Sequence, residues 1–264
     1  MSGYLRLVSI GYRRRLAYRG GVFSLIWLYA LTFGVMICFW RFIGAGTEGE
    51  TMRGFTYPET ITYLFLAVLI RNFVNSDLDI RLATKISSGA FAGDLILPLN
   101  PILGNVAESI GTSLYMFTWG SLPIGAALMP FVPLVGTTLA RLPAFAGTLV
   151  MAAAMNIYIN YIAGLMSVWT RRIAGVLALK ACLTLVLSGT LVPIAFLPDW
   201  AASLARWSPF ASLTHVPVLS YLGKLSAGDL TAALAVQLAW MLVLHVLAAG
   251  LWSKARKRYA AYGG

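Results

Sequence analysis

Long apolar runs separated by short polar stretches extend along the whole chain. A membrane-spanning helix needs about 20 mostly apolar residues, and several of the runs reach that length. The expected spans cover residues 21–42, 58–75, 102–129, 142–169, 173–196 and 230–252. Some of them contain Gly or Pro, which membrane helices tolerate. The pattern predicts an all-α membrane protein with six transmembrane helices in one domain, residues 1–264.

Lys and Arg residues are distributed unequally between the two sides of these spans. Five of the 20 lie on one side, at Arg41, Arg53, Arg141, Arg206 and Lys224, and Lys180 lies inside a span. The other fourteen lie before the first span, in the second and fourth connections and after the last span. Because basic residues accumulate on the cytoplasmic side, we expect both termini to be cytoplasmic.

Composition agrees with a lipid environment. Hydrophobic residues make up 59% of the chain and charged residues 11%, against about 25% charged residues in soluble domains. The net charge of +11 could also indicate a nucleic-acid-binding protein. We expect no nucleic-acid partner, because the basic residues lie in short clusters between apolar runs, where they would contact anionic lipid.

The amino-terminal segment, residues 1–20, has the pattern of an amphipathic helix. Leu5, Val8, Tyr12 and Leu16 share one helical face, and the neighbouring arginines lie away from it. Such a helix can lie among the lipid head groups. The alternative is a disordered basic leader, and the apolar stripe favours the interfacial helix.

A polar segment, residues 77–101, interrupts the apolar pattern on the side expected to be cytoplasmic. It ends in the stretch KISSGAFAGDLILPLNP, in which helical spacing of apolar residues precedes Pro98. A simple turn between two helices needs about 2–8 residues, and this segment is much longer. It also carries the apolar residues Phe91, Leu95 and Ile96, which we expect to be exposed. The segment could be a turn in contact with water alone, but its length and apolar residues favour a surface that binds a cytoplasmic partner.

Three stretches resemble the type-2 ATP-binding-cassette (ABC-2) permeases. They are the stretch above, LSGTLVPIAFLPDWAASLARWSPF at residues 187–210, and the ending RKRYAAYGG. These permeases are the membrane subunits of exporters. The resemblance implies a second permease subunit, identical or not, and a separate ATPase. It also implies that residues 77–101 form the coupling segment that contacts the ATPase, through Gly89, Asp94, Leu95 and Pro98.

The same resemblance implies alternating access, an amphipathic or lipid-like substrate, and a multi-pass location in the bacterial plasma membrane. The chain has no G-x-x-x-x-G-K-[ST] stretch to hold nucleotide phosphates. We therefore expect the chain to bind no cofactor and to be no enzyme, with ATP and Mg bound by the partner ATPase.

Residues 187–210 are expected to form a re-entrant outer segment before the last span. Irregular backbone at membrane depth is tolerated only inside protein or beside a cavity, and prolines interrupt this segment. The residues that identify it are Pro193, Pro198, Trp200, Pro209 and Phe210. The alternative is an extracellular loop with an amphipathic helix lying flat.

Polar residues inside the expected spans are candidates for a transport pathway. Lys180, Thr184 and Ser188 share one helical face, and Glu108 lies in the third span. A charge as deep as Lys180 costs about 2.5–3.5 kcal/mol on insertion scales, so it needs protein, water or a carboxylate beside it. Glu108 is one possible partner. For Asn156 and Asn160, hydrogen bonding between helices is the favoured interpretation.

Other classes of site find little support. His215 and His245 lack acidic or Cys neighbours at ligand spacing, so we expect no metal site. An alternative function is a lipid-modifying membrane enzyme that uses Asp77, Asp79 and Asp94. A passive channel is a third possibility, although no ring-forming charged filter motif is present.

Overall fold

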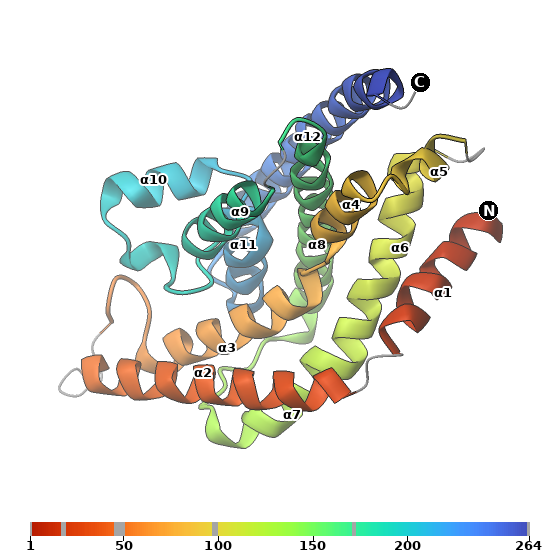
Figure 1. Ribbon diagram of the computed structural model, residues 1–264. Coiled ribbons are helices and arrows are strands. Elements are labelled where there is room, and N and C mark those ends of the chain that lie inside the picture. The colour runs from red at the N-terminus through yellow and green to blue at the C-terminus, as the bar shows by residue number, and fades with distance from the viewer. Residues whose placement is uncertain (1, 17–19, 45–50, 97–99, 171–172, 263–264) are drawn as a thin grey trace.

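The computed structural model describes residues 2–16, 20–44, 51–96, 100–170 and 173–262 (Figure 1). In these ranges the regular structure is helical, apart from one bridge between Met52 and Phe55. The all-α class predicted from the apolar pattern is therefore confirmed.

The main helices follow one another with short connections. They are α1 (Ser2–Leu16), α2 (Gly20–Gly44), α3 (Tyr57–Val74), α4 (Leu78–Ser87), α5 (Phe91–Ile96), α6 (Pro101–Tyr115), α7 (Leu122–Leu128), α8 (Leu142–Leu165), α9 (Ala174–Leu187), α10 (Asp199–Trp207), α11 (Ala211–Leu222) and α12 (Ala227–Tyr262). A π-helical turn, η1 (Met116–Ser121), joins α6 to α7. Short 3₁₀ turns are η2 (Met129–Phe131), η3 (Leu139–Arg141), η4 (Met166–Val168) and η5 (Ile194–Phe196).

Each expected span contains helical segments, but these differ in length and continuity. Three stretches of the described residues are long and apolar enough to cross a membrane: Tyr57–Ser87, Leu139–Val168 and Ala227–Tyr259. Shorter apolar helices cover Ala30–Phe42 and Ala174–Leu187. The helices show an integral membrane protein, while the six-span count and the sides of the termini stay predictions.

The fifth expected span is shorter than the apolar pattern suggests. Its helix, α9, ends at Leu187, whereas we expected residue 196. Gly189 has a φ of +75°, and a Cβ there would collide with the Tyr63 hydroxyl. The left-handed backbone and the close neighbour both require glycine, so the chain turns at this point although the sequence remains apolar.

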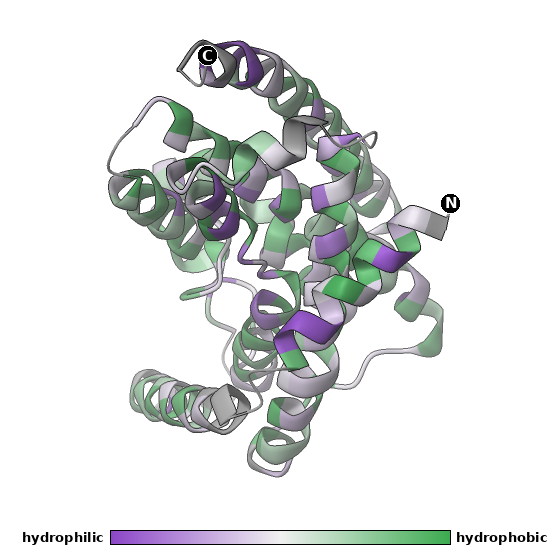
Figure 2. Ribbon diagram, turned by 45° about the vertical axis from the view of Figure 1, so that its right-hand side comes forward, coloured by the Kyte–Doolittle hydropathy of each residue, from purple (hydrophilic) through white to green (hydrophobic). Residues whose placement is uncertain are grey.

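Helix α8 occupies the centre of the structure, between α4, α11 and α12 (Figure 1). Helix α3 is buried along most of its length, and its Phe65 packs on Phe33 of α2. The opposite face of α2 exposes Trp27, Leu31 and Phe42. Figure 2 shows hydrophobic residues on the outer faces of several helices. Apolar side chains on both faces of a helix are typical of a lipid environment.

Helix α1 forms as the apolar stripe predicts, and it lies along α6 (Figure 1). The two backbones touch at Gly11 and Gly111, since a Cβ on Gly11 would collide with the Glu108 carbonyl and one on Gly111 with the Val8 carbonyl. Tyr12, from the predicted stripe, packs edge-on against Tyr115 at 5.8 Å between ring centroids. The stripe is thus partly used within the protein, and a position among lipid head groups stays a prediction.

Candidate functional site

The helical ladder is interrupted between α3 and α4, within one of the long apolar stretches. Asn75 has extended backbone (φ −66°, ψ 129°), which leaves carbonyl groups at the end of α3 without helical partners. Two side chains of α8 bind carbonyl groups at this interruption, one in α3 and one in the segment that follows it. Asn156 Nδ2 donates to the Val74 carbonyl at 2.8 Å, and Asn160 Nδ2 donates to the Ser76 carbonyl at 3.1 Å. The predicted interhelical hydrogen bonding of these two asparagines is confirmed.

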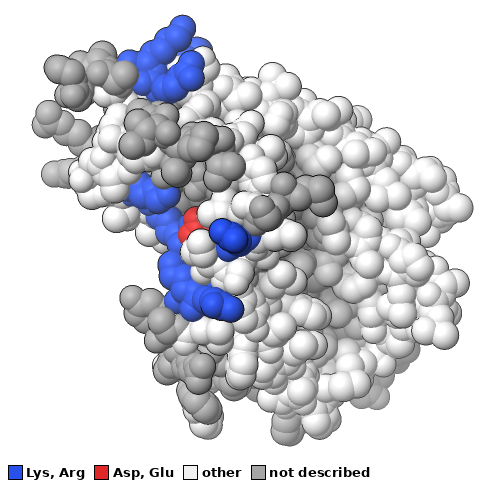
Figure 3. Space-filling model, turned by 90° about the vertical axis from the view of Figure 1, so that its right-hand side faces the viewer, with Lys and Arg blue, Asp and Glu red and all other residues white. Residues whose placement is uncertain are grey.

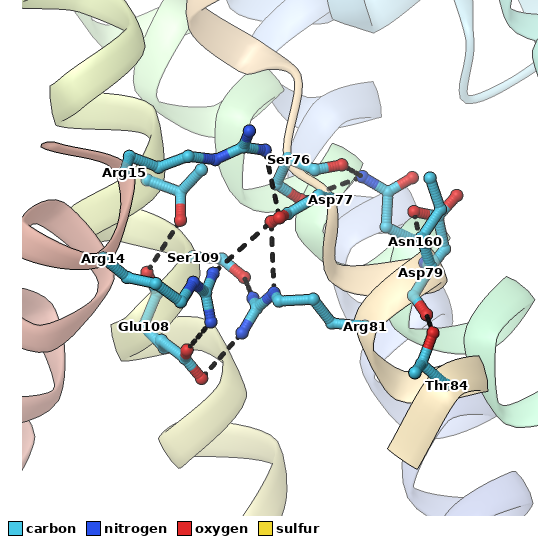
Figure 4. Close-up of polar contacts among 12 residues, drawn as sticks. Arg14, Arg15, Ser76, Asp77, Asp79, Arg81, Thr84, Glu108, Ser109 and Asn160 are labelled. Atoms are coloured by element: carbon cyan, nitrogen blue, oxygen red, sulfur yellow. Dashed lines mark hydrogen bonds and ion pairs between the residues drawn. The ribbon is translucent and has the colours of Figure 1, made fainter. Parts of the chain in front are cut away.

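Asp77, at the start of α4, joins a cluster of charged side chains that also includes Arg14 and Arg15 of α1, Arg81 of α4 and Glu108 of α6 (Figure 4). We call these five residues the arginine cluster. Asp77 binds Arg15 at 3.0 Å and Arg81 at 3.1 Å. Glu108 binds Arg81 at 2.7 Å and also pairs with Arg14. The cluster therefore connects three helices through shared ion pairs.

The arginine cluster is only partly accessible to water, with side-chain exposures of 14–35%. An isolated, exposed ion pair contributes about 0–1 kcal/mol, but loss of one partner from a buried pair costs about 3–5 kcal/mol. Because the cluster is shielded and its ion pairs are shared, we expect the cost of losing one member to lie between those limits.

Asp79 faces a different group of residues from Asp77. It pairs with Lys180 of α9, and Lys180 Nζ also donates to Asn160 Oδ1 at 2.8 Å. The side chains of Asp79 and Lys180 are 5% and 19% exposed. Asp79 is thus the carboxylate that neutralises Lys180. Glu108, the partner considered from the sequence, binds arginines instead.

A cavity of about 110 Å³ lies beside the Lys180 ion pair. Its walls come from α3, α8, α9, α11 and the segments that follow α3 and α9. The lining residues are Arg71, Val74, Asn75, Asn156, Asn160, Lys180, Ala181, Thr184, Leu185, Thr190, Leu213 and Thr214. We call it the α3–α9 cavity. It combines cationic and hydroxyl groups with apolar walls, as small-molecule sites commonly do.

The four residues predicted for the pathway are divided among three places. Lys180 and Thr184 line the α3–α9 cavity. Ser188 lies just past α9 and shares a hydrogen bond of 2.6 Å with Thr190, a residue of the cavity wall. Glu108 belongs to the arginine cluster on the other side of α4. A role in transport stays a prediction for each of them.

The predicted coupling segment is fixed to the carboxyl-terminal half of α12. Gly89, with a φ of +82°, ends the turn after α4. Phe91 follows and packs edge-on against Trp252 and Tyr259, at 5.3 and 5.0 Å between ring centroids. The expectation that Phe91 is exposed was wrong, because Phe91 is completely buried with these two rings packed against it. Its apolar surface anchors α5 to the protein and is not available to a partner.

The other predicted contact residues are described less fully. Asp94 and Leu95 belong to α5, but the placement of their side chains lies outside the described structure. Pro98 lies outside the described residues altogether. Their contact with an ATPase stays a prediction.

Basic side chains form a band near α5. Exposed examples on α1 and on the end of α12 are Arg6, Arg13, Lys254, Arg256 and Lys257. Figure 3 looks onto the face that carries the amino-terminal helix and the end of α12, and Lys and Arg atoms spread across it with little acidic surface between them. Such a face attracts anionic lipid or an acidic protein surface.

The predicted outer segment, residues 187–210, folds as a turn, η5 and the short helix α10, and α11 follows it. Pro193 is buried before η5, Pro198 precedes α10, and Pro209 and Phe210 precede α11. Trp200 on α10 is 74% exposed. Helix α11 is buried against α8 and α3, and its His215 shares a hydrogen bond of 2.9 Å with Tyr63. Entry of this segment into the outer leaflet stays a prediction.

Sequence reasoning did not identify the residues with which the side chains of α4 form ion pairs. The spacing of Asp77 and Arg81, four residues apart on one helix, was the available signal for their ion pair. Nothing local indicated that Arg71 would line the same cavity as Lys180. In the described ranges, no group of three His, Cys, Asp or Glu residues could hold a metal ion.

Comparison with known proteins identifies one family. The family model described as "ABC-2 family transporter protein" matches residues 25–263, nearly the whole chain. A search of curated proteins finds no match.

Proposed function

The chain belongs to the ABC-2 family of transporter proteins, so it is a membrane permease component of an ABC transporter, and we propose that it works as an exporter subunit driven by a separate ATPase. The partner would bind ATP and Mg and would contact α5 and the residues next to it. The permease would then pass an amphipathic or lipid-like substrate by alternating access. The proposed location is the bacterial plasma membrane, with both termini cytoplasmic and a second permease subunit, identical or not, alongside.

The attachment of α5 to the rest of the protein is the observation that carries this proposal. Phe91 is held between Trp252 and Tyr259 of α12, so a displacement of α5 must also move α12 or break that contact. The chain runs from α5 back through Gly89 directly into α4. A partner that binds α5 would therefore act on two long apolar stretches at once, those that contain α4 and α12.

Helix α4 supplies the next step of the proposed coupling. Asp77 binds arginines of α1, and Asp79 binds Lys180 of α9. Motion of α4 would be transmitted in one direction to α1 and α6 and in the other to α9. Because α9 forms a wall of the α3–α9 cavity, this path connects the ATPase contact to the proposed substrate region.

The proposal is tested by purification from mild detergent with an affinity tag, followed by identification of the proteins retained. We expect an ATP-binding-cassette ATPase to be retained by the wild type and lost with Asp94→Arg. A matched control is Asp199→Arg on α10, which lies in the proposed outer segment and should leave the ATPase bound. Circular dichroism and thermal unfolding would verify that both variants fold.

Two results would contradict the proposal. One is wild-type protein that retains no ATPase under conditions in which the membrane complex stays intact. The other is folded Asp94→Arg that retains as much ATPase as wild type. Turnover of lipid by the purified chain alone would favour a membrane enzyme, and conductance without nucleotide would favour a channel.

A further inference from the structure

We propose that the α3–α9 cavity binds an oxyanion group, a phosphate or a carboxylate, with Arg71 as its ionic partner and the Thr184 hydroxyl as a hydrogen-bond donor. The anion could be the head group of an amphiphile or a free ion, and the experiment below separates these sources. Its use as cargo would rest on the proposed function, but its binding requires this chain alone.

The charges around the cavity leave a net positive site. Two cationic side chains line it, Arg71 and Lys180, and no carboxylate is among the described lining residues. The charge of Lys180 is neutralised by Asp79. Arg71 has no ion pair with any residue that the structure describes, in contrast to Arg14, Arg15, Arg53 and Arg81. One positive charge therefore remains for a ligand.

Arg71 lies inside the apolar stretch Tyr57–Ser87. Ionisable residues at such positions normally face a cavity or a partner, because lipid solvates charge poorly. Guanidinium presents five planar N–H donors, which match the paired oxygens of phosphate and carboxylate. An oxyanion would supply the partner that Arg71 lacks within the described structure.

Thr184 gives a second, independent indication. Its hydroxyl oxygen is enclosed and has no hydrogen-bond partner among the described residues. A helical threonine usually donates to the carbonyl four residues earlier. Thr32, Thr84, Thr112, Thr118 and Thr148 all do so in this protein. Thr184 does not, so a donor is left free beside the cavity that it lines.

The shape of the cavity agrees with a head group that enters from outside. Arg71 is exposed, whereas the Thr184 oxygen is shielded from solvent, so the cationic end lies nearer the surface. The cavity volume of about 110 Å³ is several times the roughly 10–15 Å³ that a single water needs. The space can therefore hold an oxyanion group of several atoms, while Leu185 and Leu213 supply apolar contacts.

The experiment uses the full chain without an ATPase, in phosphatidylcholine nanodiscs that contain dioleoyl phosphatidic acid. Native mass spectrometry counts the phosphatidic acid retained by wild type, Arg71→Gln and Thr184→Val. In a second arm, calorimetry measures binding of inorganic phosphate to the same proteins. Arg206→Gln on α10 is the matched control, since this arginine is exposed and does not line the cavity.

We expect Arg71→Gln to weaken retention about tenfold or more and Thr184→Val about threefold, as loss of a charge-assisted and a neutral hydrogen bond would give. Arg206→Gln should bind as wild type. If Arg71→Gln weakens binding of phosphatidic acid alone, the ligand is an amphiphile. If it weakens binding of both phosphatidic acid and inorganic phosphate, the free anion is sufficient for binding. The proposal is overturned if Arg71→Gln retains as much ligand as wild type in both arms, or if Arg206→Gln loses as much as Arg71→Gln. Since no ATPase is present, these outcomes are independent of the purification test above.

Discussion

Asp77 and Asp79 lie two residues apart and bind opposite parts of the protein. Asp77 pairs with Arg15 of α1, whereas Asp79 pairs with Lys180 of α9. Successive helical residues are rotated by about 100°, so side chains two apart point to nearly opposite faces. The start of α4 is thus a junction between the α1–α6 pair and the helix that carries Lys180.

The Asp79–Lys180 pair should contribute strongly only while both partners are present. Asp79→Asn leaves the Lys180 charge nearly unpaired in a shielded site, and we expect destabilisation of about 3–5 kcal/mol. The double variant Asp79→Asn/Lys180→Met should recover part of this loss. Thermal unfolding in detergent, monitored by intrinsic fluorescence, measures the stability of both variants. Asp199→Asn, which removes the exposed pair with Arg53, should cost about 1 kcal/mol or less. Additive losses in the double variant would contradict the pairing.

The contact between α1 and α6 should require glycine at position 11, where a side chain would separate the two helices. Gly11→Val places atoms where the Glu108 carbonyl lies, so α1 must move away from α6 and the Arg14–Glu108 ion pair must break. We expect faster proteolysis at the arginines of α1 and a lower unfolding temperature. Gly3→Val is the control, because a Cβ at Gly3 meets no atom within 4 Å. Equal protease resistance of the two variants would show that α1 does not pack as described.

Phe91 should couple α5 to α12. Phe91→Ala removes a completely buried ring between Trp252 and Tyr259, and we expect a loss of about 3–5 kcal/mol if the segment cannot collapse onto the gap. Within the assembled transporter, the ATPase should still bind but should respond less to substrate. Phe42→Ala provides the comparison, since Phe42 is 83% exposed. Normal substrate-stimulated ATPase activity in Phe91→Ala would argue against this route of coupling.

The turn after α9 should require glycine. Gly189→Ala adds a Cβ to a residue with φ of +75° and directs it at the Tyr63 hydroxyl. We expect destabilisation of about 1–3 kcal/mol from backbone strain, plus disturbance of the Tyr63–His215 hydrogen bond. Gly175→Ala, at an open position of α9, should be neutral or slightly stabilising. The unfolding temperatures of the two variants, each compared with wild type, test both expectations.

The coupling segment and the polar residues illustrate how far local pattern reaches. The pattern indicated a short helix before Pro98, which the structure interrupts at Gly89, and it identified Lys180 as a charge in need of a partner. It assigned Phe91 to a partner surface, and the fold uses it internally instead. The residues around Phe91 do not reveal whether its ring is buried or exposed, because the helix that covers it, α12, lies more than 150 residues later in the chain.

The sequence by itself determined the helical, lipid-facing character of the protein, since run length and apolar content decide which segments leave water. It also indicated that α8 would use its asparagines between helices. Only the tertiary structure decided which charges meet: Asp79 with Lys180, Glu108 with the arginines, and Arg71 beside an otherwise neutral cavity. Ion pairing depends on distances of a few ångströms between segments remote in the chain. Those distances are set by helix packing, and no local pattern of residues specifies them.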